Sequence, residues 1–138
     1  MLICGPCDSG KTTLLSQLVV GKPVETYTSM VHNVFPWEVE GKPNLDLVDV
    51  PGHERIRGAI VDQFSSSARG IVYMVDSNTV SKQVRDVAEY LHSILSNHAI
   101  HKNSPPVLVI CNKQDGGLAK TGQLIQTLLE KEIEKVIF

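Results

Sequence analysis

The sequence lacks the features that mark several large classes of protein. No apolar run approaches the length of a membrane-spanning helix, and the 138 residues contain no repeat and no low-complexity segment. The three cysteines, Cys4, Cys7 and Cys111, show neither metal-ligand spacing nor a disulfide framework, which is typical of a reducing compartment. The formal net charge of −2 argues against a nucleic-acid-binding surface, so we expect no direct nucleic-acid partner. A chain of 138 residues without these features is expected to form one globular domain that is large enough to bury a core.

A phosphate-binding loop stands near the start of the chain, between an apolar segment and a helical pattern. It reads Gly5-Pro6-Cys7-Asp8-Ser9-Gly10-Lys11-Thr12, which matches G-x-x-x-x-G-K-[ST]. The two glycines allow a tight path that points backbone N–H groups at phosphate oxygens, and the helix N-terminus adds positive dipole. We expect Lys11 to reach the β- and γ-phosphates and the Thr12 hydroxyl to hold Mg²⁺. These loop residues, with Thr13, are the first predicted nucleotide-binding residues.

A second motif ends an apolar segment at 44–50. There Asp49 is followed by Val50-Pro51-Gly52, the pattern Asp-x-x-Gly. Many strands end in an aspartate and a turn, so the pattern alone is a weak signal. It becomes a strong one because it follows a phosphate loop at this spacing. We expect Asp49 to contact Mg²⁺ through water and the Gly52 N–H to sense the γ-phosphate.

A third motif identifies the base. Residues 106–111 are expected to form a buried strand, and they lead into Asn112-Lys113-Gln114-Asp115, which looks like the guanine motif Asn-Lys-x-Asp of GTPases. A carboxylate at Asp115 can accept hydrogen bonds from guanine N1–H and from the 2-amino group, whereas adenine offers neither donor. Asn112, Lys113 and Asp115 are therefore predicted to bind the nucleotide, with GTP and Mg²⁺ as cofactors.

The order of apolar segments predicts an α/β fold, and the phosphate loop with the GTPase-like guanine motif makes it look like a P-loop NTPase of the small GTPase type. It has a mostly parallel sheet with helices on both faces. The predicted strands lie near 1–5, 31–39, 44–50, 70–76 and 106–112, and the predicted helices near 10–20, 53–67, 80–98 and 119–135. Residues 31–39 are expected at an edge of the sheet because Pro36 interrupts them.

Taken together, the motifs resemble those of the signal recognition particle receptor β subunit family, GTPases akin to the Arf and Sar group. The resemblance covers nearly the whole chain, and its most specific marks are the Cys-Asp within the phosphate loop, His53 after Gly52, and Asn-Lys-Gln-Asp. It extends through Ser66-Ser67-Ala68-Arg69-Gly70-Ile71-Val72 and Val75-Asp76-Ser77.

The resemblance implies a GTP-binding receptor subunit in co-translational protein targeting, with GTP-gated binding of the N-terminal domain of the receptor α subunit. The location implied is the cytoplasmic face of the endoplasmic reticulum membrane. Relatives carry a membrane segment before the first strand, and a sixth strand and a final helix after the last helix seen here. We therefore expect 1–138 to be the GTPase domain, without its upstream membrane segment and truncated before the sixth strand.

Two switch segments are expected beside the γ-phosphate. The first spans 22–29, and alignment to the family pattern favours Thr28, with Thr26 as the rival, as the ligand of Mg²⁺ and contact of the γ-phosphate. The second spans 52–58. It places His53 where ordinary small GTPases have Gln, and His53 either orients the attacking water as a catalytic residue, together with Gly52, or is a surface histidine. The residues favour neither interpretation.

Hydrolysis is expected to be slow, and whether the chain works as an enzyme stays open. Cys7 is expected close to the γ-phosphate, where its side chain would crowd the attacking water or an incoming arginine finger, and the first switch contains no arginine. An arginine finger supplies about 10³–10⁵ in rate. The alternative function is an actively cycling GTPase of the Arf or Sar type in vesicle trafficking, which a hydrolysis rate measured with and without partner would distinguish.

Overall fold

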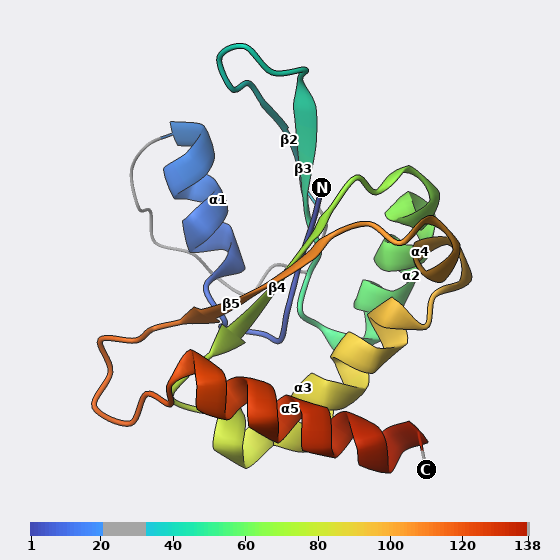
Figure 1. The fold of residues 1–138 in the computed structure, drawn as a ribbon. Coiled ribbons are helices and arrows are strands. Elements are labelled where there is room, and N and C mark those ends of the chain that lie inside the picture. Colours follow the sequence, from blue (N-terminus) through green and yellow to red (C-terminus); the bar gives the residue numbers. More distant parts are fainter. Residues whose placement is uncertain (21–32, 138) are drawn as a thin grey trace.

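The computed structural model of the chain describes residues 1–20 and 33–137. The strands are β1 (Leu2–Cys4), β2 (Asn33–Trp37), β3 (Leu45–Asp49), β4 (Ile71–Asp76) and β5 (Val107–Asn112). The helices are α1 (Lys11–Val20), α2 (Glu54–Phe64), the 3₁₀ turn η1 (Ser65–Ser67), α3 (Val80–Leu95), α4 (His98–Asn103) and α5 (Gly122–Ile137). Figure 1 shows them arranged around one central sheet.

The five strands form one sheet in the order β2-β3-β1-β4-β5. β1 pairs in parallel with β3 and β4, and β4 pairs in parallel with β5, whereas β2 runs antiparallel to β3. The mostly parallel sheet and the edge position of β2 are thus confirmed. Because the carboxyl ends of β1, β3, β4 and β5 meet at one edge, the three sequence motifs that follow β1, β3 and β5 come together there.

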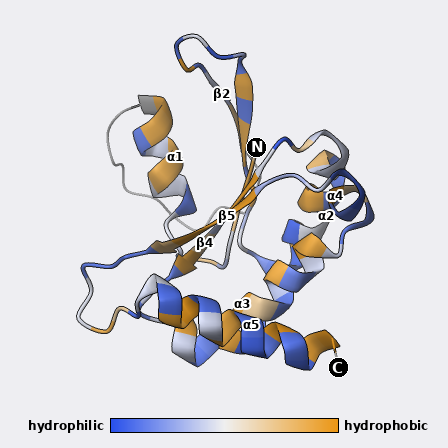
Figure 2. Cartoon of the chain, viewed as in Figure 1, coloured by the Kyte–Doolittle hydropathy of each residue, from blue (hydrophilic) through white to orange (hydrophobic). Residues whose placement is uncertain are grey.

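Helices cover both faces of the sheet, as predicted. α1 packs on one face, where Leu15 joins a buried cluster with Ile3 and Met74. α2, α3 and α5 pack on the other face, where Val61, Val87 and Ile125 belong to one large cluster (Figure 1). Central strands buried on both faces are apolar along their length, which Figure 2 shows for the middle of the sheet.

The prediction of a strand at 106–111 was right, but the prediction that it is buried was wrong, since even Ile110 and Cys111 are only partly buried. Val107, Leu108 and Val109 of β5 are 39%, 58% and 39% exposed. β5 lies at the end of the strand order and pairs only with β4 among the described residues. An apolar run therefore identified a strand correctly without showing that both of its sides are covered.

The helix expected near 119–135 begins only at Gly122, and two other helices end before their predicted boundaries for local reasons. The helix expected at 80–98 ends at Leu95, and a short helix, α4, begins at His98. Asn97 separates them because its side-chain oxygen accepts hydrogen bonds from the N–H groups of Ala99 and Ile100, at 3.1 and 3.3 Å. The helix expected at 53–67 ends at Phe64 and continues as η1.

Within the described ranges, no helix is both long enough and apolar enough to cross a membrane.

Candidate functional site

The phosphate loop joins β1 to α1 and closes around the ammonium group of Lys11. Gly5 and Gly10 have φ values of +147° and +100°, which side chains with a Cβ rarely adopt. Lys11 is 7% exposed, and its Nζ donates to the carbonyl oxygens of Gly5 and Pro6 at 3.0 and 2.7 Å. Burial lowers the pKa of Lys11, although the nearby Asp49 carboxylate works in the opposite direction. A buried cation inside a glycine-lined loop is suited to receive phosphate oxygens.

Thr12 and Asp49 meet at the mouth of this loop. The Thr12 hydroxyl donates to Asp49 Oδ2 at 3.1 Å. Asp49 is 1% exposed, and its Oδ1 has no hydrogen-bond partner among the described residues. Burial raises the pKa of Asp49, while the Thr12 hydrogen bond and the Lys11 charge lower it. An orphaned carboxylate oxygen beside a hydroxyl fits Mg²⁺, which keeps several waters and takes few protein ligands. The candidate ligand Thr28 lies outside the described residues.

The start of the second switch rests directly on the phosphate loop. A Cβ on the buried Gly52 would lie 2.6 Å from the backbone nitrogen of Cys7, so only glycine allows this approach. The Gly52 carbonyl accepts a hydrogen bond from Arg57 Nη1 at 3.4 Å, and the Arg57 guanidinium stacks 3.8 Å from the centre of the Tyr90 ring on α3. Gly52 is thereby placed beside the loop that is predicted to cradle the γ-phosphate.

His53 has a structural role that the sequence interpretation did not include. Its Nδ1 accepts a hydrogen bond from the Arg55 N–H at 3.3 Å and caps the N-terminus of α2. The ring is half-buried and lines a cavity of about 380 Å³, together with the exposed Cys7, Arg57 and Gln83. A catalytic role for His53 stays a prediction. Its capping of the α2 N-terminus is a separate, structural role.

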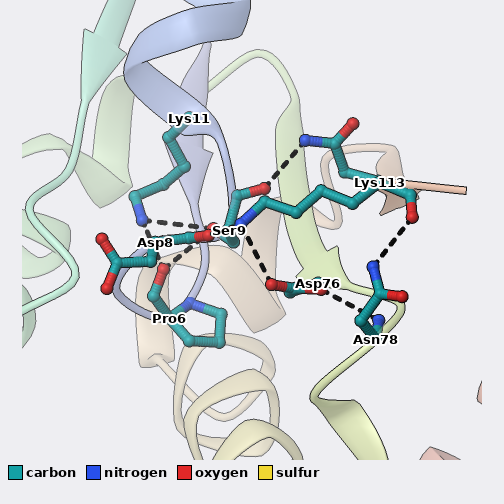
Figure 3. A network of polar contacts seen from close by, with 8 residues as sticks. Pro6, Asp8, Ser9, Lys11, Asp76, Asn78 and Lys113 are labelled. Carbon is teal, nitrogen blue, oxygen red and sulfur yellow. Dashed lines mark hydrogen bonds and ion pairs between the residues drawn. The ribbon is translucent and has the colours of Figure 1, made fainter. Parts of the chain in front are cut away.

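The guanine motif is tied to the phosphate loop by two side chains (Figure 3). Asn112 Nδ2 donates to the Ser9 carbonyl at 3.0 Å. Lys113 Nζ donates to the Asp8 carbonyl at 2.5 Å and to Asp76 Oδ2 at 3.0 Å. These contacts connect segments more than a hundred residues apart, so the loop and the base motif form one unit.

Asp115 stands apart from this network. Its side chain is exposed, in the loop between β5 and α5, where a base could approach it. The structure therefore brings Asn112 and Lys113 to the phosphate loop and leaves Asp115 facing solvent. The sequence patterns do not predict the contacts of Asp76 and Asn78 with Lys113, because these residues lie about 35 positions away in the chain.

Comparisons with known proteins agree with this geometry. The family model described as "Signal recognition particle receptor beta subunit" matches residues 1–138. The mouse signal recognition particle receptor subunit beta is 44% identical over 135 residues, which are 96% of this chain and 50% of that protein. "The Structure of the Mammalian SRP Receptor" matches with a TM-score of 0.89 at 42% identity, covering 98% of this chain and 73% of that one.

A more distant solved structure shows the same fold. It is the receptor complex "SRb-GTP/SRX" from Chaetomium thermophilum, with a TM-score of 0.84 at 23% identity, covering 98% of this chain and 78% of that one. The chain spans about half the length of the curated relatives it matches.

Proposed function

Because the chain belongs to the signal recognition particle receptor β subunit family, we propose that it is the GTP-binding subunit of that receptor. Its GTP-bound state binds the N-terminal domain of the receptor α subunit during co-translational protein targeting. The site of action is the cytoplasmic face of the endoplasmic reticulum membrane. The related complex from Chaetomium thermophilum, which holds GTP together with SRX, supports a partner that binds the GTP form.

The contact between Gly52 and the phosphate loop carries this proposal. Gly52 is separated from α2 only by its N-cap residue His53, and the Gly52 backbone lies against Pro6 and Cys7 of the loop. A γ-phosphate held by the loop would meet the Gly52 N–H, whereas GDP offers no group there. Nucleotide state therefore acts on the position of α2, and a surface formed by α2 can bind a partner in one state only.

Different residues of the site bind different parts of the nucleotide and its metal ion. Lys11 and the loop N–H groups bind the phosphates, and Asp115 pairs with the guanine N1–H and 2-amino groups. Thr12, Asp49 through water and Thr28 would hold Mg²⁺. A Mg²⁺ ion held by these residues would supply positive charge beside the phosphates.

Hydrolysis is secondary in this proposal. The exposed Cys7 borders the cavity beside Gly52, where it would crowd an attacking water or an incoming arginine. The segment 22–29 contains no arginine to act in cis. Without an arginine finger, which supplies about 10³–10⁵ in rate, the resting state is GTP-bound.

We also propose that residues 1–138 are the GTPase domain of a longer, membrane-attached protein. The relatives are about twice as long as this chain. The outer edge of β5, with Val107, Leu108 and Val109 exposed, is suited to receive the sixth strand that the family resemblance implies.

The test is the affinity of the full-length protein for the α subunit N-terminal domain in three nucleotide states. Calorimetry with GTP, GDP and a non-hydrolysable GTP analogue should give strong binding with GTP and the analogue. GDP should weaken it by at least about tenfold, since a smaller difference hardly shifts the population. Equal affinity in all three states, or fast unassisted hydrolysis, would favour the actively cycling Arf or Sar type of GTPase instead.

A further inference from the structure

The end of β4 makes several contacts with the guanine motif that no predicted role explains. Asp76, its last residue, faces two partners at once. Its Oδ2 accepts from Lys113 Nζ at 3.0 Å, and its Oδ1 accepts from the backbone N–H of Asn78 at 2.9 Å. Although partial burial works in the opposite direction, these contacts keep the pKa of Asp76 below its ordinary value. Asp76 is thus a charged acceptor between its own turn and the guanine motif (Figure 3).

Asn78 holds the backbone of the same motif. Its Nδ2 donates to the Lys113 carbonyl at 3.0 Å. Lys113 has a φ of +61°, a left-handed conformation that a residue other than glycine adopts only when its surroundings hold it there. A Cβ on Gly116 would collide with the Asn78 amide, so the loop after Asp115 also closes tightly over this side chain.

Ser77, which lies between Asp76 and Asn78, also contacts the guanine motif. It is fully buried, its N–H donates to the Asn112 carbonyl at 3.0 Å, and its Oγ accepts from Gln114 Nε2 at 2.8 Å. Asp76 and Asn78 therefore both contact Lys113, while Ser77 contacts its two neighbours Asn112 and Gln114. Asp115, which follows at once, has its position set by a backbone that these contacts hold.

We propose that Asp76 and Asn78 are positioning residues for guanine recognition. They hold the backbone of residues 112–114 so that the Asp115 carboxylate faces the N1–H and 2-amino groups of the base. Asp76 does so through the Lys113 ammonium and Asn78 through the Lys113 carbonyl. Neither residue touches the nucleotide in this proposal, which rests on the guanine-nucleotide binding proposed above.

The physical reason lies in the geometry of the contact between Asp115 and the base. A carboxylate that accepts two parallel hydrogen bonds from guanine loses both when it is displaced by about an ångström. Lys113 also donates to the Asp8 carbonyl. The contacts that fix Lys113 therefore also fix the distance between the guanine motif and the phosphate loop. Charge-assisted contacts such as the one between Asp76 and Lys113 are stronger than neutral ones.

The experiment compares GDP with inosine diphosphate, which lacks the 2-amino group, on the full-length protein. Calorimetry is run on wild type, Asp76→Ala, Asp76→Asn and Asn78→Ala. Asp76→Ala should weaken GDP binding by about tenfold, the loss of one charged hydrogen bond. It should also reduce the preference for GDP over inosine diphosphate by about threefold or more, while the ratio of GTP to GDP affinity stays unchanged.

The other variants separate the two contacts. Asp76→Asn keeps an acceptor for the Asn78 N–H but places an amide NH2 where Oδ2 accepted from Lys113 Nζ, so it removes the Lys113 contact and spares the turn. It should therefore weaken GDP binding less than Asp76→Ala and still reduce the preference between the two bases. Asn78→Ala should also reduce the preference between the two bases. Glu89→Ala is the matched control, because it removes an exposed ion pair of similar length, 2.9 Å to Arg85, away from the site.

Each outcome decides the proposal. A reduced base preference in folded Asp76 and Asn78 variants, with Glu89→Ala unchanged, supports it. Weaker GDP binding with an unchanged base preference would make the contacts merely structural and overturn it, as would unchanged GDP binding. If Asp76→Ala fails to fold, Asp76→Asn and Asn78→Ala give the same comparison. A wild type that binds no GDP would instead overturn the proposed function, and this inference with it.

Discussion

The phosphate end and the guanine end of the site hold their charged groups in different ways. At the phosphate end, Lys11 and Asp49 are almost fully buried, at 7% and 1% exposure, and one oxygen of Asp49 has no partner among the described residues. At the guanine end, Lys113 and Asp76 are paired at 3.0 Å and partly solvated, with side chains 40% and 15% exposed.

This difference indicates what each end contributes. Buried, incompletely paired charges are costly in the ligand-free fold, so the proposed binding of a nucleotide with Mg²⁺ would relieve that cost. A paired and preformed network changes little on binding and therefore adds selectivity. The phosphate end is thus expected to dominate affinity and the guanine end the choice of base.

The largest effect is expected from Lys11→Ala. Removing the buried ammonium leaves the phosphates without their main positive partner, so the affinity for GTP and GDP should fall by at least about 3 kcal/mol, more than about a hundredfold. Calorimetric titration of both nucleotides measures this loss. Lys42→Ala, at an exposed lysine in the turn after β2, is the control. Unchanged affinity in Lys11→Ala would mean that the loop does not cradle phosphates.

Asp115→Asn should shift the base preference of the site from guanine towards xanthine. The amide keeps the shape of the carboxylate but loses its charge and one acceptor, so GTP affinity should fall by about 2–3 kcal/mol. Xanthosine triphosphate, which carries a carbonyl in place of the 2-amino group, should gain affinity. Competition between the two nucleotides measures the exchange. Equal binding of ATP and GTP by the wild type would show that the guanine end is not selective.

Thr12→Ala should affect the dependence of binding on metal more than binding itself. Without the hydroxyl, GTP affinity should fall by roughly 1–2 kcal/mol, the scale of a hydrogen bond to a charged group, and respond little to added Mg²⁺. Titrations with Mg²⁺ and with a chelator measure this response. Thr12→Ser keeps the hydroxyl and should retain the wild-type response. A full Mg²⁺ response in Thr12→Ala would place the metal elsewhere.

The smallest effect is a pH-dependent change in ligand-free stability for Asp49→Asn. The folded-state pKa of Asp49 is raised above 3.8, mainly by burial. The group therefore contributes stability that is present below the unfolded value and lost as pH rises through the folded value. As the pH rises from about 4 to about 7, the free energy of unfolding of Asp49→Asn should therefore increase relative to that of the wild type.

Thermal unfolding of the ligand-free proteins at both pH values measures this gain. Glu40→Gln, an exposed carboxylate in the turn after β2, is the control. The same Asp49→Asn variant should bind GTP with less dependence on Mg²⁺. A stability difference that does not change with pH would show that Asp49 carries no cost in the ligand-free fold.

Much of the site was predictable because its chemistry depends on local patterns. Gly5, Gly10 and Lys11 act within one loop, and their spacing predicts the loop's shape. The same holds for the existence of all five strands and of four helices, which follow from apolar periodicity. The break at Asn97 was also readable, since an asparagine before a short helical segment favours a new N-terminus.

Other features depend on residues that are distant in sequence. No local pattern shows that Asp76 faces Lys113, or that Asn112 bonds to Ser9, since strand order and register place them together. His53 could be recognised as a departure from Gln, but its cap contact depends on where α2 begins. The exposure of Leu108 likewise follows from the place of β5 at the edge of the sheet.

The sequence by itself determined the chemical types present: a phosphate loop, an Asp-x-x-Gly turn, a guanine motif and an α/β order of elements. Short spacings along one chain suffice for these, because backbone geometry carries them. Only the tertiary structure decided which charges are buried and unpaired, which are paired at the surface, and which segment holds the guanine motif in place. Those properties arise from the packing of β1, β3, β4 and β5 side by side, and burial and pairing exist only once distant segments meet.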